Sequence, residues 1–145
     1  MSNHSYRIFS LLALILALGG CADYEFSVND KLVYTPLPLF SDFSLADPAL
    51  QTCVSQTISD EKITRVELLE KLNCSHAGIS SLEGLDQFAN LQILNLGQNQ
   101  LRNVGVLSLL TELERVNLDG NPELDCASVG NWQTSIELTL PPHCN

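Results

Sequence analysis

Residues 91–110 read LQILNLGQNQLRNVGVLSLL, and this stretch decides the fold. Its apolar positions recur at a step of 22: one step earlier, residues 69–74 read LEKLNC, and one step later, residues 113–118 read LERVNL. A partial fourth copy places Leu138 and Leu140 beneath Val116 and Leu118. Further columns at this step are Ala77, Asn99 and Asn121; Leu82, Val104 and Cys126; Leu85, Leu107 and Val129; and Phe88, Leu110 and Trp132. The period predicts stacked units, because one unit cannot bury its apolar side alone.

The second copy matches the pattern LxxLxLxxNxLxxVxxLxxL throughout. In this it resembles the leucine-rich repeat family, specifically the 22-residue class of internalin-like bacterial proteins. The resemblance covers about half of the chain, residues 69–140. It implies an α/β fold: a short solenoid of about three to four repeats with one parallel sheet, an N-terminal helical cap and a disulfide-closed C-terminal cap. In the family, the column of Asn99 and Asn121 hydrogen-bonds buried turn backbone, and Ala77 and His143 interrupt that column at the ends.

One short strand is expected in each copy, with Leu94 and Leu96 pointing inward and Asn95 pointing to the concave side. The outward positions of successive strands form the expected partner-binding face. Its residues are Lys71, Asn73, Ile93, Asn95, Arg115, Asn117 and Asp119. Such an amide row with mixed charge can bind an extended peptide, a loop or a glycan. The alternative is a row of asparagines that satisfy one another by hydrogen bonds across strands.

The ends of a stacked fold must be covered, and the chain offers a helix for the first end. Asp47-Pro48 predicts a helix start, with Asp47 as N-cap. Leu50, Val54 and Ile58 then form one apolar helical face, whereas residues 60–68 fit either a further helical turn or an extended entry strand.

Residues 1–21 predict export and lipid anchoring. Arg7 precedes an apolar run from Ile8 to Leu18, which is typical of a secretory signal and too short to span a bilayer as a lasting helix. The sequence Leu18-Gly19-Gly20-Cys21 resembles the lipobox of bacterial lipoproteins, which implies acylation (palmitate) at Cys21. In Gram-negative lipoproteins an aspartate directly after the cysteine favours the inner membrane, so Ala22 at this position implies the outer membrane, with the protein facing either the periplasm or the surface. An ordinary signal peptide is the alternative.

The charge and cysteine content limit the partners and the compartment. Net charge is −10, and loss of Arg7 with the signal leaves 17 acidic against 6 basic residues, so nucleic acid is a poor partner. Four cysteines remain besides Cys21, and an exported chain favours disulfides among them. Of the three pairings, sequence order and the repeat frame favour Cys53 with Cys74 and Cys126 with Cys144. These placements resemble the capping units of other exported leucine-rich repeat proteins.

The segment after Cys21 is aromatic rather than rich in Gly and Ser, so it is no simple flexible tether. It is expected to pack on the cap, to bind a partner near the membrane, or to be disordered. The predicted organisation is a signal peptide over residues 1–20, a lipidated segment over 21–45, an N-terminal cap over 46–68, and repeats with a C-terminal cap over 69–145.

No catalytic residue, cofactor or metal site is predicted. Asp119, Asn121, Glu123 and Asp125 alternate side-chain oxygens, but the glycine and the distal glutamate of an EF-hand loop are missing. His76 and His143 lie beside Cys74 and Cys144, yet disulfides are favoured over zinc in an oxidising compartment. No histidine has an evident Ser or Cys partner for nucleophilic catalysis.

The sequence therefore favours a membrane-anchored, non-catalytic module of the bacterial envelope that binds a protein partner. Two alternatives stay open. One is a structural accessory lipoprotein of an envelope assembly that uses residues 22–43 as its contact, and the other is a glycan-binding module.

Overall fold

The computed structural model describes residues 26–28, 31–130 and 136–144. The predicted signal peptide over residues 1–20, the acylation site at Cys21 and the indole of Trp132 lie outside the described residues. The chain divides into two compact units, Met1–Leu37 and Pro38–Asn145. In the first unit, β1 (Phe26–Val28) pairs antiparallel with β2 (Lys31–Tyr34). No helix in the described part of the chain is long and apolar enough to cross a membrane.

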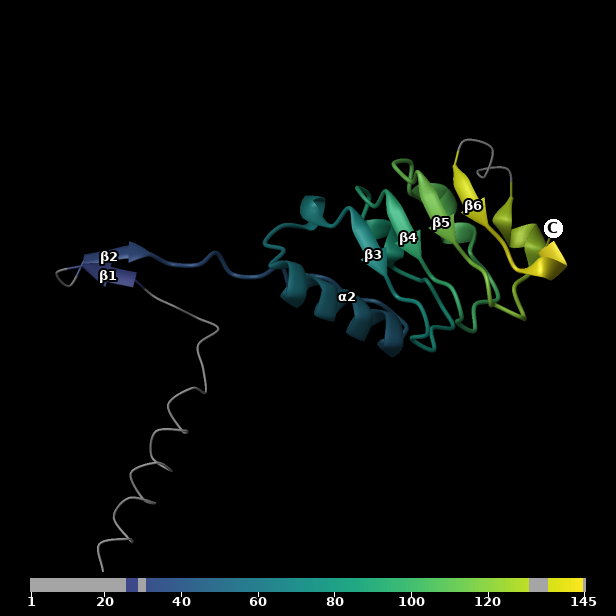
Figure 1. Ribbon diagram of the computed structural model, residues 1–145, viewed down its shortest axis with the longest axis horizontal. Helices are drawn as coiled ribbons and strands as arrows, with labels where there is room; N and C mark the ends of the chain where they lie inside the picture. Colours follow the sequence, from purple (N-terminus) through teal and green to yellow (C-terminus); the bar gives the residue numbers. More distant parts are fainter. Residues whose placement is uncertain (1–25, 29–30, 131–135, 145) are drawn as a thin grey trace, which may run out of the picture. The chain divides into compact units, whose positions relative to one another are not determined.

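The second unit contains a four-stranded parallel sheet (Figure 1). Its strands are β3 (Lys71–Asn73), β4 (Ile93–Asn95), β5 (Arg115–Asn117) and β6 (Glu137–Thr139), and they lie in sequence order. Each strand pairs with the next exactly one repeat further along the chain, as in Leu72 with Leu94 and Leu94 with Val116. The repeat period of the sequence is therefore the register of the sheet, and the α/β class is confirmed.

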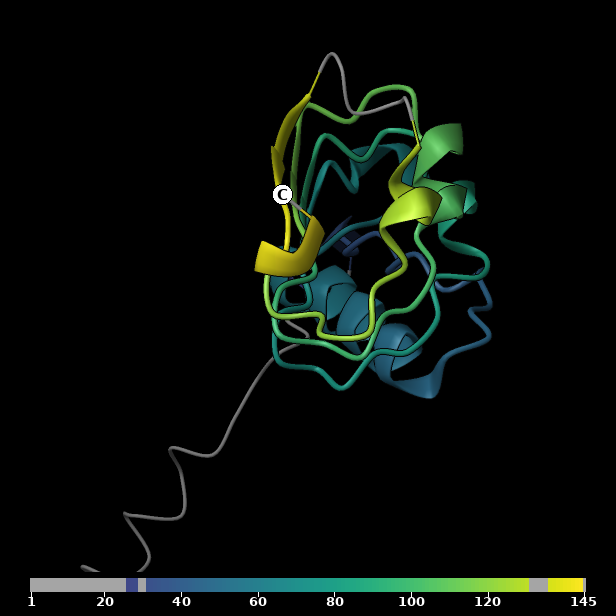
Figure 2. The same cartoon turned by 90° about the vertical axis from the view of Figure 1, so that its right-hand side faces the viewer.

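Between strands the chain returns along the opposite side of the unit through short 3₁₀ helices (Figure 2). These are η3 (Leu85–Gln87), η4 (Gly105–Leu109) and η5 (Cys126–Val129). Apolar side chains from both sides fill the space between, and the predicted inward residues Leu94 and Leu96 are only 1% and 0% exposed. Burying a leucine in this way contributes roughly 2 kcal/mol, so the recurring apolar columns supply the main stabilisation.

Two buried asparagines hold the turns that follow the strands. The Asn99 Oδ1 atom accepts the N–H groups of Ala77 and Ile79, both at 3.1 Å, and its Nδ2 atom donates to the carbonyls of Cys74 and Leu96. Asn121 repeats the arrangement one step later, accepting the Leu101 N–H and donating to the Leu96 and Leu118 carbonyls. These side chains satisfy backbone groups that would otherwise be buried without partners.

The end of the sheet beside β3 is covered by α2 (Pro48–Glu61), as Figure 1 shows. The predicted start is confirmed, because Asp47 Oδ1 accepts the N–H groups of Ala49 and Leu50. Leu50, Val54 and Ile58 are the buried face of this helix. The helix ends at Glu61, and the next helical element is the short η2 (Val66–Leu68), so most of the ambiguous stretch 60–68 is neither a continued α-helix nor a paired strand.

Asp47 also connects the helix to the first turn of the sheet. Its second oxygen, Oδ2, accepts the Ser80 N–H at 2.8 Å, the Ser80 hydroxyl at 2.8 Å and the Ser81 N–H at 3.1 Å. Burial raises the pKa of this carboxyl, but the hydrogen bonds from Ser80, Leu50 and Ser81 outweigh it and lower the pKa to about 2. One carboxylate therefore caps α2 and fixes its position on the first turn.

Residues of the predicted lipidated segment 21–45 also belong to this compact unit, which begins at Pro38. Phe43 packs edge to face on the buried Phe88, with ring centroids 5.5 Å apart, and stacks on Phe40 at 5.7 Å. The Phe40 N–H donates to the Ile63 carbonyl at 2.8 Å. Residues 40–43 therefore contact the predicted cap at Ile63 and the first repeat at Phe88, which agrees with packing rather than with a disordered segment.

Two disulfides close the ends of the unit, and both are the pairings favoured by the sequence. Cys53 on α2 is bonded to Cys74 just after β3, with Cα atoms 5.8 Å apart. Cys126 at the start of η5 is bonded to Cys144, with Cα atoms 5.3 Å apart.

Removing the second disulfide should lower stability. Cys126→Ser is expected to lower the free energy of unfolding by about 3 kcal/mol, because a loop of this length is no longer closed in the unfolded chain. Thermal unfolding measured with and without reductant checks this, with Cys126→Ser/Cys144→Ser as the matched variant. An equal melting temperature for wild type and the double variant under oxidising conditions would refute a stabilising role.

Candidate functional site

The candidate site is the exposed face of the β3–β6 sheet, which we call the sheet face. It consists of the outward residues Lys71, Asn73, Ile93, Asn95, Arg115, Asn117, Glu137 and Thr139. The register brings Asn73, Asn95 and Asn117 into one row with Thr139, and Lys71, Ile93 and Arg115 into a second row with Glu137. Neighbours within a row are about 4.8 Å apart.

The asparagines of the row all use their side-chain oxygens within the chain. Asn73 Oδ1 accepts the Ser75 N–H at 3.3 Å, Asn95 Oδ1 accepts the Gly97 N–H at 3.1 Å, and Asn117 Oδ1 accepts the Asp119 N–H at 3.0 Å. These are Asx turns, in which the side chain bonds the backbone two residues on. They fix the three amides, because only the oxygen can accept from a backbone N–H.

The row of asparagines is only partly hydrogen-bonded across strands. Asn117 Nδ2 donates to Asn95 Oδ1 at 3.1 Å, which realises the predicted cross-strand alternative for one pair. Gly97 leaves room for this bond, since a Cβ there would lie 3.1 Å from Asn117 Nδ2. Within the described residues, the Nδ2 atoms of Asn73 and Asn95 have no acceptor.

The two cations of the sheet face differ in their surroundings. Arg115 Nε lies 2.7 Å from Glu137 Oε2 on the next strand, and this pair is exposed. Exposed pairs of this kind contribute little to stability, but they neutralise the local charge. For Lys71, no carboxylate of the described part of the chain lies within ion-pair distance.

All seven residues predicted for the partner-binding face come together, six of them on the strands. The seventh, Asp119, lies just after β5, where its N–H is held by Asn117 and its carbonyl accepts the Gln98 N–H at 2.7 Å. It is half-buried and forms the border of the sheet face.

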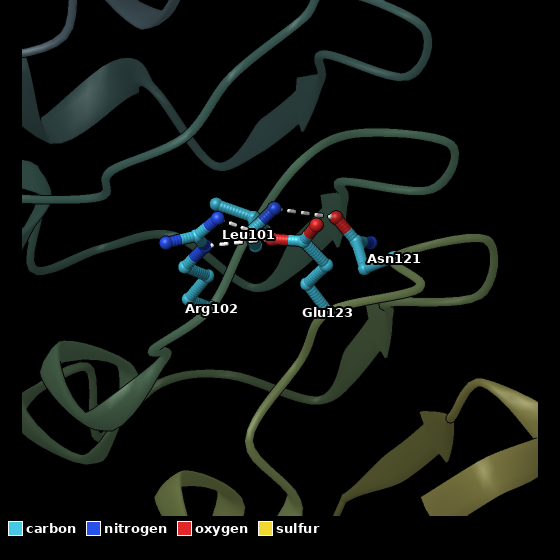
Figure 3. A network of polar contacts seen from close by, with 4 residues as sticks. All are labelled: Leu101, Arg102, Asn121 and Glu123. Atoms are coloured by element: carbon cyan, nitrogen blue, oxygen red, sulfur yellow. Dashed lines mark hydrogen bonds and ion pairs between the residues drawn. The ribbon is translucent and has the colours of Figure 1, made fainter.

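Two of the alternating side chains over residues 119–125 are directed to partners within the chain. Figure 3 shows Asn121 directed to the Leu101 N–H and Glu123 directed to Arg102. The Arg102 Nε to Glu123 Oε2 distance is 2.8 Å, so the two side chains are committed to different partners.

Cys126, His143 and Cys144 lie close enough together for a metal, but the two sulfurs are joined as a disulfide and offer no thiolate. His143 Nε2 lies 3.0 Å from the Leu124 carbonyl, which can only accept, so this nitrogen carries the hydrogen. The disulfide favoured by the sequence for this pair of cysteines is therefore present.

A shallow groove of about 510 Å³ borders the sheet face at Asn73 and was not predicted. Its other wall is α2, where Thr52, Gln56 and Asp60 line it and Gln56 Nε2 donates to Asp60 Oδ1 at 2.8 Å. These residues are spaced four apart, so the polar stripe could have been read from the sequence as one helical face.

Comparison with known proteins leaves the site to be interpreted from its own chemistry. No protein-family model matches the chain, and no curated protein matches it significantly.

Proposed function

We propose that the chain is a leucine-rich repeat lipoprotein of the bacterial envelope that binds a protein partner through the sheet face without catalysing a reaction. The observation that carries the proposal is the constant strand register, which aligns polar side chains of successive strands into continuous rows. The buried Asn99 and Asn121, each bonding the backbone of its own and the preceding turn, support the same family. In this proposal Cys21, which lies outside the described residues, supplies the membrane anchor.

A rigid face suits binding because little conformational entropy is lost when the partner docks. The two disulfides and the Asp47 contacts hold the ends of the sheet in place. Four short strands make a small face, at or below the roughly 1,600 Å² of a standard interface. Anchoring at Cys21 offsets this by raising the effective concentration at the membrane.

Photo-cross-linking in intact cells tests the binding face. A photoreactive residue at Ile93 should capture a defined partner, whereas the same residue at Leu109, which is 61% exposed on η4 away from the strands, should not. Asn95→Arg/Asn117→Arg should reduce capture at least tenfold, because two long cations replace the amides. If capture survives those changes but fails when residues 22–37, which precede the packed Phe40 and Phe43, are deleted, the accessory-segment alternative replaces this proposal.

Membrane fractionation tests the anchor. Cys21→Ser should move the protein from the membrane to the soluble fraction and abolish palmitate labelling, since the acyl chains supply about 0.8 kcal/mol per buried CH2. Cys53→Ser is the matched control, because it removes a cysteine that is bonded to Cys74 and should leave labelling intact. Labelling that persists in Cys21→Ser would exclude this acylation site.

A further inference from the structure

We infer that the β3–β4 half of the sheet face recognises a carboxylate carried by an extended peptide segment of the partner, which Lys71 and the amide nitrogens of Asn73 and Asn95 bind together. This inference rests on the proposed function and specifies the chemistry of its partner.

The direction of the amides is the first argument. Because Ser75 and Gly97 donate their N–H groups to Asn73 Oδ1 and Asn95 Oδ1, both oxygens are occupied and both NH2 groups remain directed away from those bonds. Asn95 Oδ1 is occupied twice, since it also accepts from Asn117. This part of the sheet face therefore offers donors, and the ligand must supply acceptors.

Charge is the second argument. Lys71 is exposed and, within the described residues, unpaired, whereas Arg115 is neutralised by Glu137. Lys71 and Asn73 lie two residues apart on one strand, about 7 Å, so one carboxylate can approach the ammonium group and the amide donors together. The half-buried Ile93 beside Lys71 can contact the aliphatic part of an acidic side chain.

The net charge of the chain limits the kind of ligand that can carry the carboxylate. At −10 the chain repels a polyanion. A single acidic residue can bind the donors of the β3–β4 half. If the rest of the segment is neutral or basic, the net negative charge of the chain does not repel it. In the other half of the sheet face, Glu137 presents carboxylate acceptors to the rest of such a segment, and Asp119 does so at the border.

The test uses the full-length chain in detergent and pools of short, terminally blocked peptides, randomised except for a central residue that is Glu, Gln or Lys. The Glu pool should bind about tenfold more tightly than the Gln pool, as expected for a charge-assisted hydrogen bond. It should also shift the side-chain amide NMR signals of Asn73 and Asn95. Preference for the Lys pool, or no binding by any pool, would overturn the inference.

Near-isosteric variants sharpen the result. Asn95→Asp keeps the acceptor for Gly97 and replaces the free NH2 by oxygen, so binding of the Glu pool should fall at least tenfold, as it should in Lys71→Glu. Asn103→Asp is the matched control, because Asn103 Oδ1 accepts the Gly105 N–H at 2.9 Å in the same kind of turn, beside η4. It should change binding less than about twofold, since its charge is distant and screened.

The outcomes also separate this inference from the proposed function. If the Glu and Gln pools bind equally and Asn95→Arg/Asn117→Arg abolishes both, the sheet face binds peptides and the carboxylate assignment is wrong. If oligogalacturonate shifts the Asn73 and Asn95 amides and no peptide pool does, the ligand is an acidic glycan and the peptide assignment is wrong.

Discussion

Asp47→Ala should lower the free energy of unfolding by about 3 kcal/mol at pH 7. The change removes the N-cap of α2, which bonds Ala49 and Leu50, and it also leaves the N–H groups of Ser80 and Ser81 without their acceptor. Since α2 covers the end of the sheet, loss of these contacts loosens the cap as a whole. Urea denaturation followed by circular dichroism measures the effect.

Asp125→Ala is the matched control for Asp47. Asp125 is also an N-cap, with Oδ1 accepting the Ala127 N–H at 3.0 Å, but it is exposed and caps only the short η5. Its loss should cost about 1 kcal/mol or less. Equal effects of the two changes would show that the contacts of Asp47 with Ser80 and Ser81 contribute nothing.

The same carboxylate should make stability depend on pH. Its folded pKa of about 2 lies below the ordinary 3.8, so the ionised form stabilises the fold. The contribution, about 2 kcal/mol, is fully present above pH 4 and is lost as the pH falls through 2. Asp47→Asn lacks it, and the stability difference between wild type and this variant should therefore shrink between pH 5 and pH 2. A constant difference would contradict the lowered pKa.

The second large effect is expected at Asn99. Asn99→Ala should lower the free energy of unfolding by about 4 kcal/mol, because it leaves the N–H groups of Ala77 and Ile79 and the carbonyl of Cys74 without their side-chain partner. Asn103→Ala is the control, since Asn103 is exposed and bonds only the Gly105 N–H among the described residues; it should cost less than about 1 kcal/mol.

Asn99→Asp separates the donor from the acceptor role. An aspartate keeps the acceptor for Ala77 and Ile79 but places a buried negative charge against the carbonyls of Cys74 and Leu96. The pKa of this carboxyl should therefore rise, because only the protonated form can donate. The variant should be least stable near pH 7 and recover as the pH falls toward 4. A loss of stability that does not change with pH would argue against the donor role.

The sequence was sufficient for features that depend on local order or on the repeat. The period of 22 predicted which residues pair across strands, because each copy folds alike and docks only on its neighbours. Asp47 followed by Pro48 predicted the helix start, because capping depends on bonds within the first turn. Sequence order and the same frame favoured, among three possible pairings, the two disulfides that the structure contains.

Contacts between parts of the chain that are distant in sequence could not be predicted from the sequence. The bonds of Asp47 to Ser80 and Ser81 join distant parts of the sequence and exist only because α2 lies on the first turn. Ala77 marked the absence of an asparagine there, but nothing in the sequence indicated that an aspartate of the cap would bond the same turn. The direction of the Asn73 and Asn95 amides likewise depends on turn geometry, which the letters N-x-S and N-x-G suggest only weakly.

The constant register has a consequence for how this molecule can change in length. Because β3, β4 and β5 each meet the next strand at the same offset, an in-frame duplication of one period within residues 91–125, which contain no cysteine, would add one strand to the sheet and leave both closing disulfides intact. A gain or loss of any other number of residues would shift the apolar columns out of phase. The sheet face can therefore lengthen by whole periods, through in-frame duplication, without a change at either end.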